Sequence, residues 1–205
     1  MMYKHAVKQL KISFMLLSIL TLLTGVIYPL AVTAIAQLFF PWQANGSLLQ
    51  DHNQIIGSQL IGQYFNSANY FWGRPSATSP FPYNAANSSG SNMGPSNPDF
   101  LTMVNDRVNH LHQSDSNNPQ LVPVDLVTAS ASGLDPEISP LAAYFQINRV
   151  AKASHISAEK LRNLIDQLII KRSFSILGEP RINVLELNLA LNKLRSAHDR
   201  ASTQS

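Results

Sequence analysis

The chain opens with one long apolar segment and continues as a mixed apolar and polar sequence. Residues 12–40 contain no charged side chain. As a helix, this segment would extend over roughly 43 Å, which exceeds the hydrocarbon core of a bilayer, about 30 Å. Phe39, Phe40 and Trp42 lie at the end of this segment, where aromatic side chains meet a membrane interface. The pattern predicts one transmembrane helix over residues 12–40.

The basic residues around this segment predict its orientation. Lys4, Lys8 and Lys11 precede it, and the next Lys or Arg is Arg74. Because basic flanks stay on the cytoplasmic side, we expect residues 1–11 to be a cytoplasmic tail and residues 41–205 an extracytoplasmic domain. The alternative is a signal peptide cleaved near Ala36, but its apolar region would exceed the usual length of about 7–15 residues.

Small side chains lie along one face of the predicted membrane helix. Thr21, Gly25 and Pro29 are spaced four residues apart, and Tyr28 lies beside them. Small residues at this spacing allow a second helix to approach closely. Two interpretations remain open here: packing against a partner helix through these residues, or a plain anchor that faces lipid.

Helical spacing recurs in the polar part of the chain. Apolar residues predict a short helix over residues 56–65 and further helices starting at Pro98, at Pro140 and after Ser157. Asn97, Ser139 and Ser157 are the residue types that cap helix N-termini, and proline at the first helical position strengthens the first two assignments.

Strand signals are fewer. Residues 70–72 are a short aromatic run, and residues 122–128 are rich in β-branched side chains, although Pro123 restricts that strand to a sheet edge. Residues 182–194 alternate like a strand, but Asn183 followed by Glu186 resembles a capping pair and favours a helix. Several helices with few strands predict a single α+β domain after the membrane helix.

Two long segments, residues 73–98 and 129–137, are rich in Ser, Asn, Gly and Pro. A loop as long as residues 73–98 inside a compact domain is usually functional or disordered. Their glycines and serines could cradle a phosphate, but they match neither the P-loop nor a dinucleotide fingerprint, and turn formation explains the composition better.

Charge and chemistry narrow the functional classes. The net charge is +3, and the three N-terminal lysines account for all of it, so the outer domain has no electrostatic footprint for nucleic acid. The chain has no cysteine, which excludes disulfides and thiolate chemistry. His110 and His112 have no further ligand at metal-binding spacing, and no serine lies in a G-x-S-x-G motif. We therefore assign no catalytic and no metal-binding residue; a membrane-anchored periplasmic hydrolase is the alternative function.

Several distinctive runs occur in a fixed order along almost the whole chain. They include Thr24-Gly25-Val26-Ile27-Tyr28-Pro29, Gln43-Ala44-Asn45-Gly46-Ser47-Leu48, Tyr83-Asn84-Ala85-Ala86, Ser89-Gly90-Ser91-Asn92, Gly94-Pro95-Ser96-Asn97-Pro98, Val122-Pro123-Val124-Asp125-Leu126-Val127-Thr128-Ala129-Ser130-Ala131-Ser132-Gly133-Leu134-Asp135-Pro136 and Asn183-Val184-Leu185-Glu186-Leu187-Asn188. Together, these runs resemble the C subunit of the bacterial potassium-transporting P-type ATPase, the Kdp complex.

The resemblance implies a single-pass protein of the bacterial inner membrane, with a cytoplasmic N-terminus and a periplasmic domain. It implies a non-catalytic subunit of an ATP-driven potassium importer, which stabilises the complex and acts as a catalytic chaperone for ATP binding. The implied partners are a hydrolytic P-type subunit, a channel-like potassium-translocating subunit, a small membrane subunit and the bilayer. ATP and potassium belong to the complex, and no cofactor is assigned to this chain. The Asp-Lys-Thr-Gly motif of the hydrolytic subunit does not occur in this sequence.

The uncharged loops are the expected docking surface of such a subunit, because rigid turns suit a fixed interface. The candidate residues lie within residues 83–98 and 125–140: Tyr83, Asn84, Ser91, Asn92, Gly94, Asn97, Asp125, Ser130, Ser132 and Asp135. The alternative is that they only shape the domain. A second hypothesis is that Asp51, Asp115, Asp135 and Glu137 concentrate potassium at a pore mouth.

Overall fold

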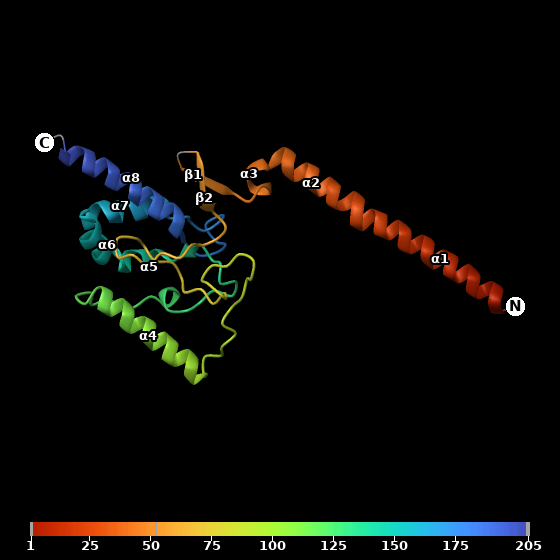
Figure 1. The fold of residues 1–205 in the computed structure, drawn as a ribbon, viewed down its shortest axis with the longest axis horizontal. Coiled ribbons are helices and arrows are strands. Elements are labelled where there is room, and N and C mark those ends of the chain that lie inside the picture. Colours follow the sequence, from red (N-terminus) through yellow and green to blue (C-terminus); the bar gives the residue numbers. More distant parts are fainter. Residues whose placement is uncertain (1, 52, 204–205) are drawn as a thin grey trace. The chain divides into compact units, whose positions relative to one another are not determined.

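The computed structural model describes residues 2–51 and 53–203, and the chain forms two compact units that meet at Leu48 and Leu49. In the first unit, α1 (Met2–Leu22), the π-helical turn η1 (Leu23–Ile27) and α2 (Tyr28–Phe39) form one continuous helix (Figure 1). Within the described residues, the segment His5–Phe39 is the one helix long and apolar enough to cross a membrane. By length and composition, this helix confirms the prediction of one N-terminal membrane helix. Where a membrane begins and ends along it stays a prediction.

The π-helical turn has a local cause in Pro29. In a regular α-helix, a proline ring clashes with the carbonyl group four residues earlier, which here belongs to Gly25. The chain widens at this point, and the Tyr28 N–H donates to the carbonyl of Leu23, five residues back. The hydroxyl group of Thr24 donates to the carbonyl of Leu20 at 2.8 Å, so its polar atom is satisfied within the helix.

The start of the second unit differs from the prediction. After the short helix α3 (Pro41–Ala44), strands β1 (Leu48–Asp51) and β2 (Gln54–Ser58) form a two-stranded sheet. Residues 59–97, all described, form neither helix nor strand, so the predicted helix at 56–65 and strand at 70–72 are wrong. Gly57 and Gly62 instead lie close to other residues of the second unit: an added Cβ atom would lie 2.3 Å from the Gln63 side chain at the first and 2.3 Å from the Tyr83 ring at the second.

The helix starts were predicted well. α4 (Pro98–Ser114), α5 (Pro140–Phe145) and α7 (Ala158–Leu168) begin after Asn97, Ser139 and Ser157, whose side chains accept backbone N–H bonds as caps. The helix predicted from Pro140 breaks at Gln146 and continues as α6 (Ile147–Ser154). The strand predicted at 122–128 is wrong: Pro123 leads into a single 3₁₀ turn, η2 (Val124–Leu126).

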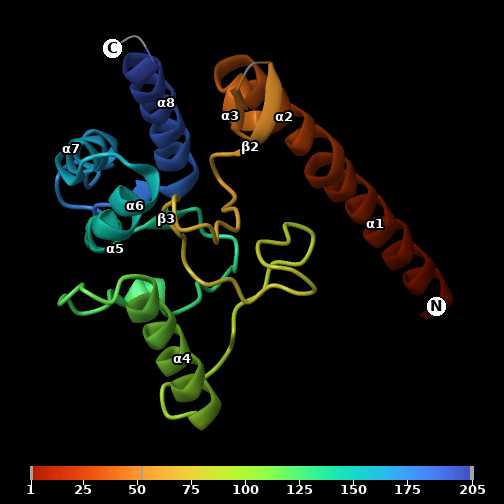
Figure 2. The ribbon, with the colours of Figure 1, turned by 60° about the vertical axis from the view of Figure 1, so that its left-hand side comes forward.

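The C-terminal part forms the core of the second unit. The segments β3 (Glu137–Ile138) and β4 (Ile182–Asn183) pair antiparallel, and α8 (Val184–Thr203) follows β4 directly. The Asn183 side chain accepts the N–H of Glu186, which confirms the capping pair and the preference for a helix. α7 packs against α5, α6 and α8, while α4 lies apart from this bundle (Figure 2). The fully buried side chains of this C-terminal core include Leu161, Ile165, Ile182, Leu187 and Leu191. Helices with two small antiparallel sheets confirm the α+β class.

Candidate interaction site

The two polar loops predicted as a docking surface lie against each other. The Ser89 N–H donates to the carbonyl of Ser132 at 2.9 Å, and the Ser88 hydroxyl donates to the same carbonyl at 3.0 Å. A Cβ atom at Gly90 would lie 2.8 Å from the carbonyl oxygen of Ala131. Gly133 has φ +67°, and a Cβ there would lie 2.5 Å from the Ser89 carbonyl oxygen. The small residues are therefore required by the close approach of two backbones.

Tyr83 is hydrogen-bonded to residues 74 and 76, which precede it in the same irregular segment. Its hydroxyl donates to the carbonyl of Arg74 at 2.5 Å, and its N–H donates to the Ser76 hydroxyl at 2.9 Å. The residue has φ +58°, an uncommon conformation for a large side chain. Burial, followed by the nearby Asp135 carboxylate, raises the pKa of Tyr83 to about 12. The Tyr83 side chain therefore stabilises the second unit from within.

Most of the other predicted docking residues also bond within the unit. Asp135 forms an ion pair with Arg74 at 3.1 Å, and the Asp125 carboxylate accepts the Ser139 N–H at 2.7 Å. The remaining bonds are local: the Asn84 amide donates to Ser79, the Ser130 hydroxyl accepts from Gly133, the Ser132 hydroxyl accepts from Leu134, and Asn97 caps α4. These contacts support the alternative that the residues shape the domain. Asn92 and Gly94 are exposed and Ser91 is half-buried. A docking role stays a prediction for all ten.

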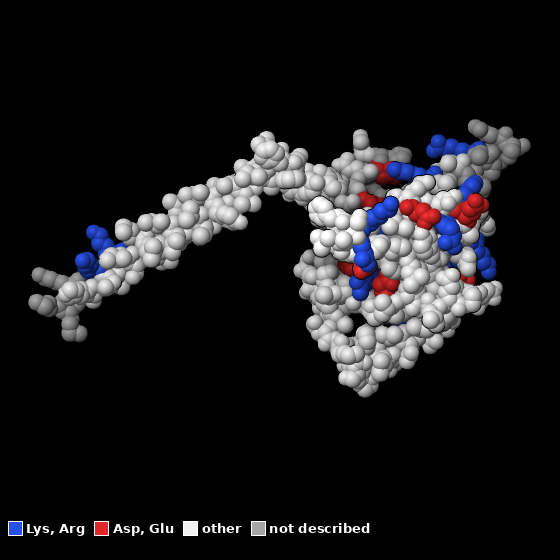
Figure 3. Space-filling view, turned by 180° about the vertical axis from the view of Figure 1, so that it is seen from behind, with Lys and Arg blue, Asp and Glu red and all other residues white. Residues whose placement is uncertain are grey.

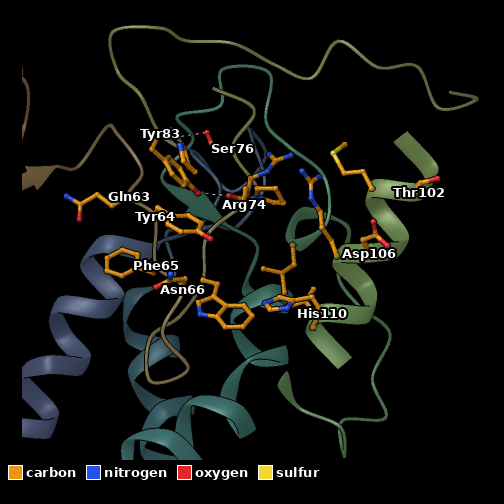
Figure 4. A pocket seen from close by; sticks show the side chains of 18 of the residues that line it. Gln63, Tyr64, Phe65, Asn66, Arg74, Ser76, Tyr83, Thr102, Asp106 and His110 are labelled. Atoms are coloured by element: carbon orange, nitrogen blue, oxygen red, sulfur yellow. Dashed lines mark hydrogen bonds between the residues drawn. The ribbon is translucent and has the colours of Figure 1, made fainter. Parts of the chain in front are cut away.

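A cavity of about 600 Å³, with Tyr83 in its wall, lies between residues 63–83 and α4 (Figure 4). Aromatic rings form part of its wall, and the rings of Trp72 and His110 stack with centroids 5.4 Å apart. The charged groups at its edge come from both sides: Arg74, Asp99, Asp106 and Arg107. Burial lowers the pKa of Arg107, whose guanidinium donates to the carbonyl of Val127. Of the residues in this wall, Tyr83 was predicted to dock a partner, and His110 was considered only as a metal ligand. The signal for this wall was the concentration of aromatic residues between 64 and 72.

A buried arginine supports the back of Trp72. The Arg149 guanidinium lies 3.8 Å from the centre of the Trp72 ring and donates to the carbonyls of Ala68 and Tyr70 at 2.6 and 3.0 Å. It also donates to the Gln146 side-chain oxygen at 2.5 Å. Burial lowers the pKa of Arg149 to about 10. This cation organises extended backbone rather than facing a ligand.

Within the described residues, no three His, Asp or Glu side chains come together as a metal site. His112 is exposed, whereas His110 stacks on Trp72. The hydroxyls of Ser88, Ser130 and Ser132 are engaged with backbone groups of the loops, as described above.

Charges are mixed over the second unit. On the face seen in Figure 3, Lys and Arg side chains lie among Asp and Glu side chains. Two of the four carboxylates expected to attract potassium are in ion pairs, Asp135 with Arg74 and Glu137 with Arg181. Pairing cancels much of their field, so the geometry gives the pore-mouth hypothesis little support.

Comparison with known proteins identifies the family. A family model described as K⁺-transporting ATPase, c chain matches residues 10–193. The potassium-transporting ATPase KdpC subunit of Herpetosiphon aurantiacus is 56% identical over 178 residues, which cover 87% of this chain and 92% of the relative. The KdpC subunit of Methylococcus capsulatus is 52% identical over 189 residues, covering 92% of this chain and 100% of the relative. The chain therefore belongs to the family of K⁺-transporting ATPase C chains.

Proposed function

We propose that this chain is the non-catalytic accessory subunit of an ATP-driven, high-affinity potassium importer. The observation that carries the proposal is the extent of the family match, which spans the apolar helix and nearly all of the second unit. The relatives are named as subunits of a potassium-transporting ATPase, so the activity of the complex is ATP-dependent potassium transport.

The proposed location is a bacterial inner membrane, crossed once. Basic side chains gather at the N-terminal end of the first unit (Figure 3), where Lys8 and Lys11 precede the apolar run. The positive-inside rule then assigns the N-terminus to the cytoplasm and the second unit to the periplasm. A cysteine introduced at Asn163, an exposed position, should react with a membrane-impermeant maleimide in intact spheroplasts. A cysteine introduced at Lys8 should react only after lysis, and the reverse pattern would contradict this topology.

The proposed role in assembly rests on the rigidity of the second unit. The Ser89–Ser132 backbone bond and the Arg74–Asp135 ion pair join the two loops, and the Tyr83 hydroxyl donates to the Arg74 carbonyl. A surface whose shape is fixed before binding loses little conformational entropy on association. We propose that the subunit uses such a surface to hold a hydrolytic P-type subunit, a channel-like subunit and a small membrane subunit together.

The proposed catalytic-chaperone role requires coupling across the membrane. A periplasmic unit cannot touch ATP in the cytoplasm, so an effect on ATP affinity must pass through membrane helices, with different contacts in two states of the pump. The test compares the KM for ATP of complexes with and without this chain. A higher KM without the chain, at unchanged hydrolytic-subunit content, supports the role; an unchanged KM contradicts it.

Assembly is tested by isolating the intact chain through a C-terminal tag from mild-detergent membranes of potassium-starved cells. Mass identification of a large P-type ATPase subunit and a channel-like subunit would support the proposed function. Recovery of this chain alone, from membranes that contain those subunits, would contradict it.

A further inference from the structure

A hairpin joins α7 to β4 and projects from the second unit; it follows α7 and precedes α8 as a blue loop in Figure 1. We call residues 170–181 the 170–181 hairpin. At its base, Ile170 and Arg181 exchange backbone hydrogen bonds of 2.8 and 3.1 Å, and further out Ser173 and Leu177 exchange two bonds of 2.9 Å. The chain then enters β4, whose pairing with β3 belongs to the core. The hairpin is thus firmly held at its base.

The tip of this hairpin is apolar and exposed. Phe174 is 88% exposed and Ile176 is 75% exposed, and Leu177 is exposed as well. Hairpin tips are usually formed by Gly, Asn or Asp. These residues adopt the positive φ angles that tight turns require, and they are compatible with exposure to water. The tip therefore holds large hydrophobic groups in water without burying them within the second unit.

The backbone of the tip is also strained. Phe174 has φ +53° and Ser175 has φ +64°, where glycine is normally favoured. A bulky residue in this region costs free energy, and such outliers cluster at functional sites. Nothing that Phe174 buries in the second unit offsets this cost. Strain together with exposure at one side chain points to a contact outside the second unit.

A hollow of about 530 Å³ adjoins the hairpin. Gly178, Pro180 and Arg181 form one wall, and Val124 and Leu141, both exposed, contribute to another. Paired charged side chains also line this hollow, among them Glu137 and Arg181. A projecting aromatic and aliphatic tip beside a hollow with exposed aliphatic side chains matches the centre of a protein interface, where a few large apolar groups enter pockets on the partner.

The charges around this surface favour a protein over a lipid headgroup layer. Arg172 is paired with Glu179 at 2.5 Å, Arg181 with Glu137 at 2.8 Å, and Arg74 with Asp135 at 3.1 Å. Among the described residues, Lys171 is the hairpin cation that forms no ion pair. Binding to anionic lipid depends on clusters of unpaired Lys and Arg, which this surface does not offer. Its net neutrality suits an uncharged protein surface.

We propose that the 170–181 hairpin and the adjoining hollow dock an uncharged, apolar segment that a membrane-embedded subunit of the pump exposes on the outer side. This inference rests on the proposed function, since it supplies the contact by which the second unit binds a partner. The tip enters a pocket of the partner, and the hollow receives an aliphatic side chain in return.

The test replaces two tip residues in the full-length tagged chain, Phe174→Ser and Ile176→Ser together. Both side chains are in water, so folding is unaffected, and the amount of co-purified membrane subunit should fall by about tenfold or more, as for the loss of interface hot spots. The matched control is Leu121→Ser, since Leu121 is 93% exposed and lies outside the hairpin. It should leave recovery unchanged. Undiminished recovery by the tip variant, with the unaltered chain also recovering its partners, would overturn the hairpin proposal alone.

Photo-crosslinking identifies the occupant. A benzophenone amino acid at position 174 of the full chain should crosslink in membranes to a membrane-embedded pump subunit identified by mass. Crosslinks only to lipid, only to a second copy of this chain, or to nothing would each overturn the proposal. If the unaltered chain recovers no pump subunit at all, the proposed function fails and the hairpin proposal fails with it.

Discussion

Asn188 on α8 binds the backbone of Phe71 with both ends of its side-chain amide. The Phe71 N–H donates to the Asn188 oxygen at 2.9 Å, and the Asn188 amide donates to the Phe71 carbonyl at 2.9 Å. Both residues are buried. The amide thus takes the place of a neighbouring strand: it satisfies the backbone N–H and carbonyl groups of an extended residue that has no sheet partner.

Replacing Asn188 by Ala should lower the free energy of unfolding by about 2–4 kcal/mol, because two buried backbone groups lose their partners. The measurement is denaturant unfolding of the full chain in detergent, followed by tryptophan fluorescence. Asn163→Ala on the exposed face of α7 is the control and should change stability by less than about 0.5 kcal/mol. Similar losses in both variants would show that the amide is not specifically required.

Because of Tyr83, the second unit should lose folding stability at alkaline pH. Its pKa is about 12 in the folded chain, against the ordinary value of 10.0, because burial disfavours the phenolate. As pH rises, the unfolded chain therefore loses this proton first. The stability that Tyr83 contributes is complete below pH 10 and is lost progressively between about pH 10 and 12.

This expectation can be checked by following tyrosinate absorbance during an alkaline titration of the folded chain. One phenol should ionise close to pH 12, and that step should disappear in Tyr83→Phe. Tyr64→Phe, which removes an exposed phenol, should leave the late step in place. A late step that persists in Tyr83→Phe would assign it to another tyrosine.

Local signals in the sequence were enough to predict the helix starts. Asn97, Ser139 and Ser157 act as caps through bonds that span two or three residues, so each start could be read from its own neighbourhood. The wrong elements have distant causes. Phe71 looked like part of a strand, but its partner is a side chain 117 residues away. The apolar spacing over residues 56–65 was helical, yet Gly62 packs against Tyr83 and Asp135.

The candidate site could be predicted only in part. Residues 83–98 and 125–140 were singled out as unusual, because small polar residues have a local signature, and their docking role stays a prediction. That these loops bond to each other depends on contacts such as Ser89 with Ser132, which no spacing encodes. The hairpin tip was missed because Phe174 resembles an ordinary apolar residue until its exposure is known.

Gly62 should tolerate no side chain. Its N–H donates to the Leu134 carbonyl at 2.8 Å, and an added Cβ would lie 2.7 Å from Tyr83 Cδ1 and 2.8 Å from the Asp135 carbonyl oxygen. We expect Gly62→Ala to destabilise the second unit by about 1–3 kcal/mol, the usual cost of overpacking. Limited proteolysis of residues 73–98 should speed up in parallel. Gly94→Ala is the matched control, because nothing lies within 4 Å of its Cβ position, and it should cleave like the unaltered chain.

Gly25 tests whether the π-helical turn is a packing surface. Thr21, Gly25, Tyr28 and Pro29 lie in or beside η1, and a turn that widens around a glycine offers backbone to a neighbouring helix. Gly25→Leu should therefore reduce co-purification of the partner subunits by about tenfold, the effect of losing close backbone contact at a helix interface. Leu23→Phe adds bulk two residues away, on the opposite side of the helix, and should leave assembly intact. Insertion of both variants is checked by alkaline extraction of membranes, which removes proteins that are not integrated. If Gly25→Leu is inserted and assembles like the unaltered chain, this face contacts lipid, and the plain-anchor interpretation is correct.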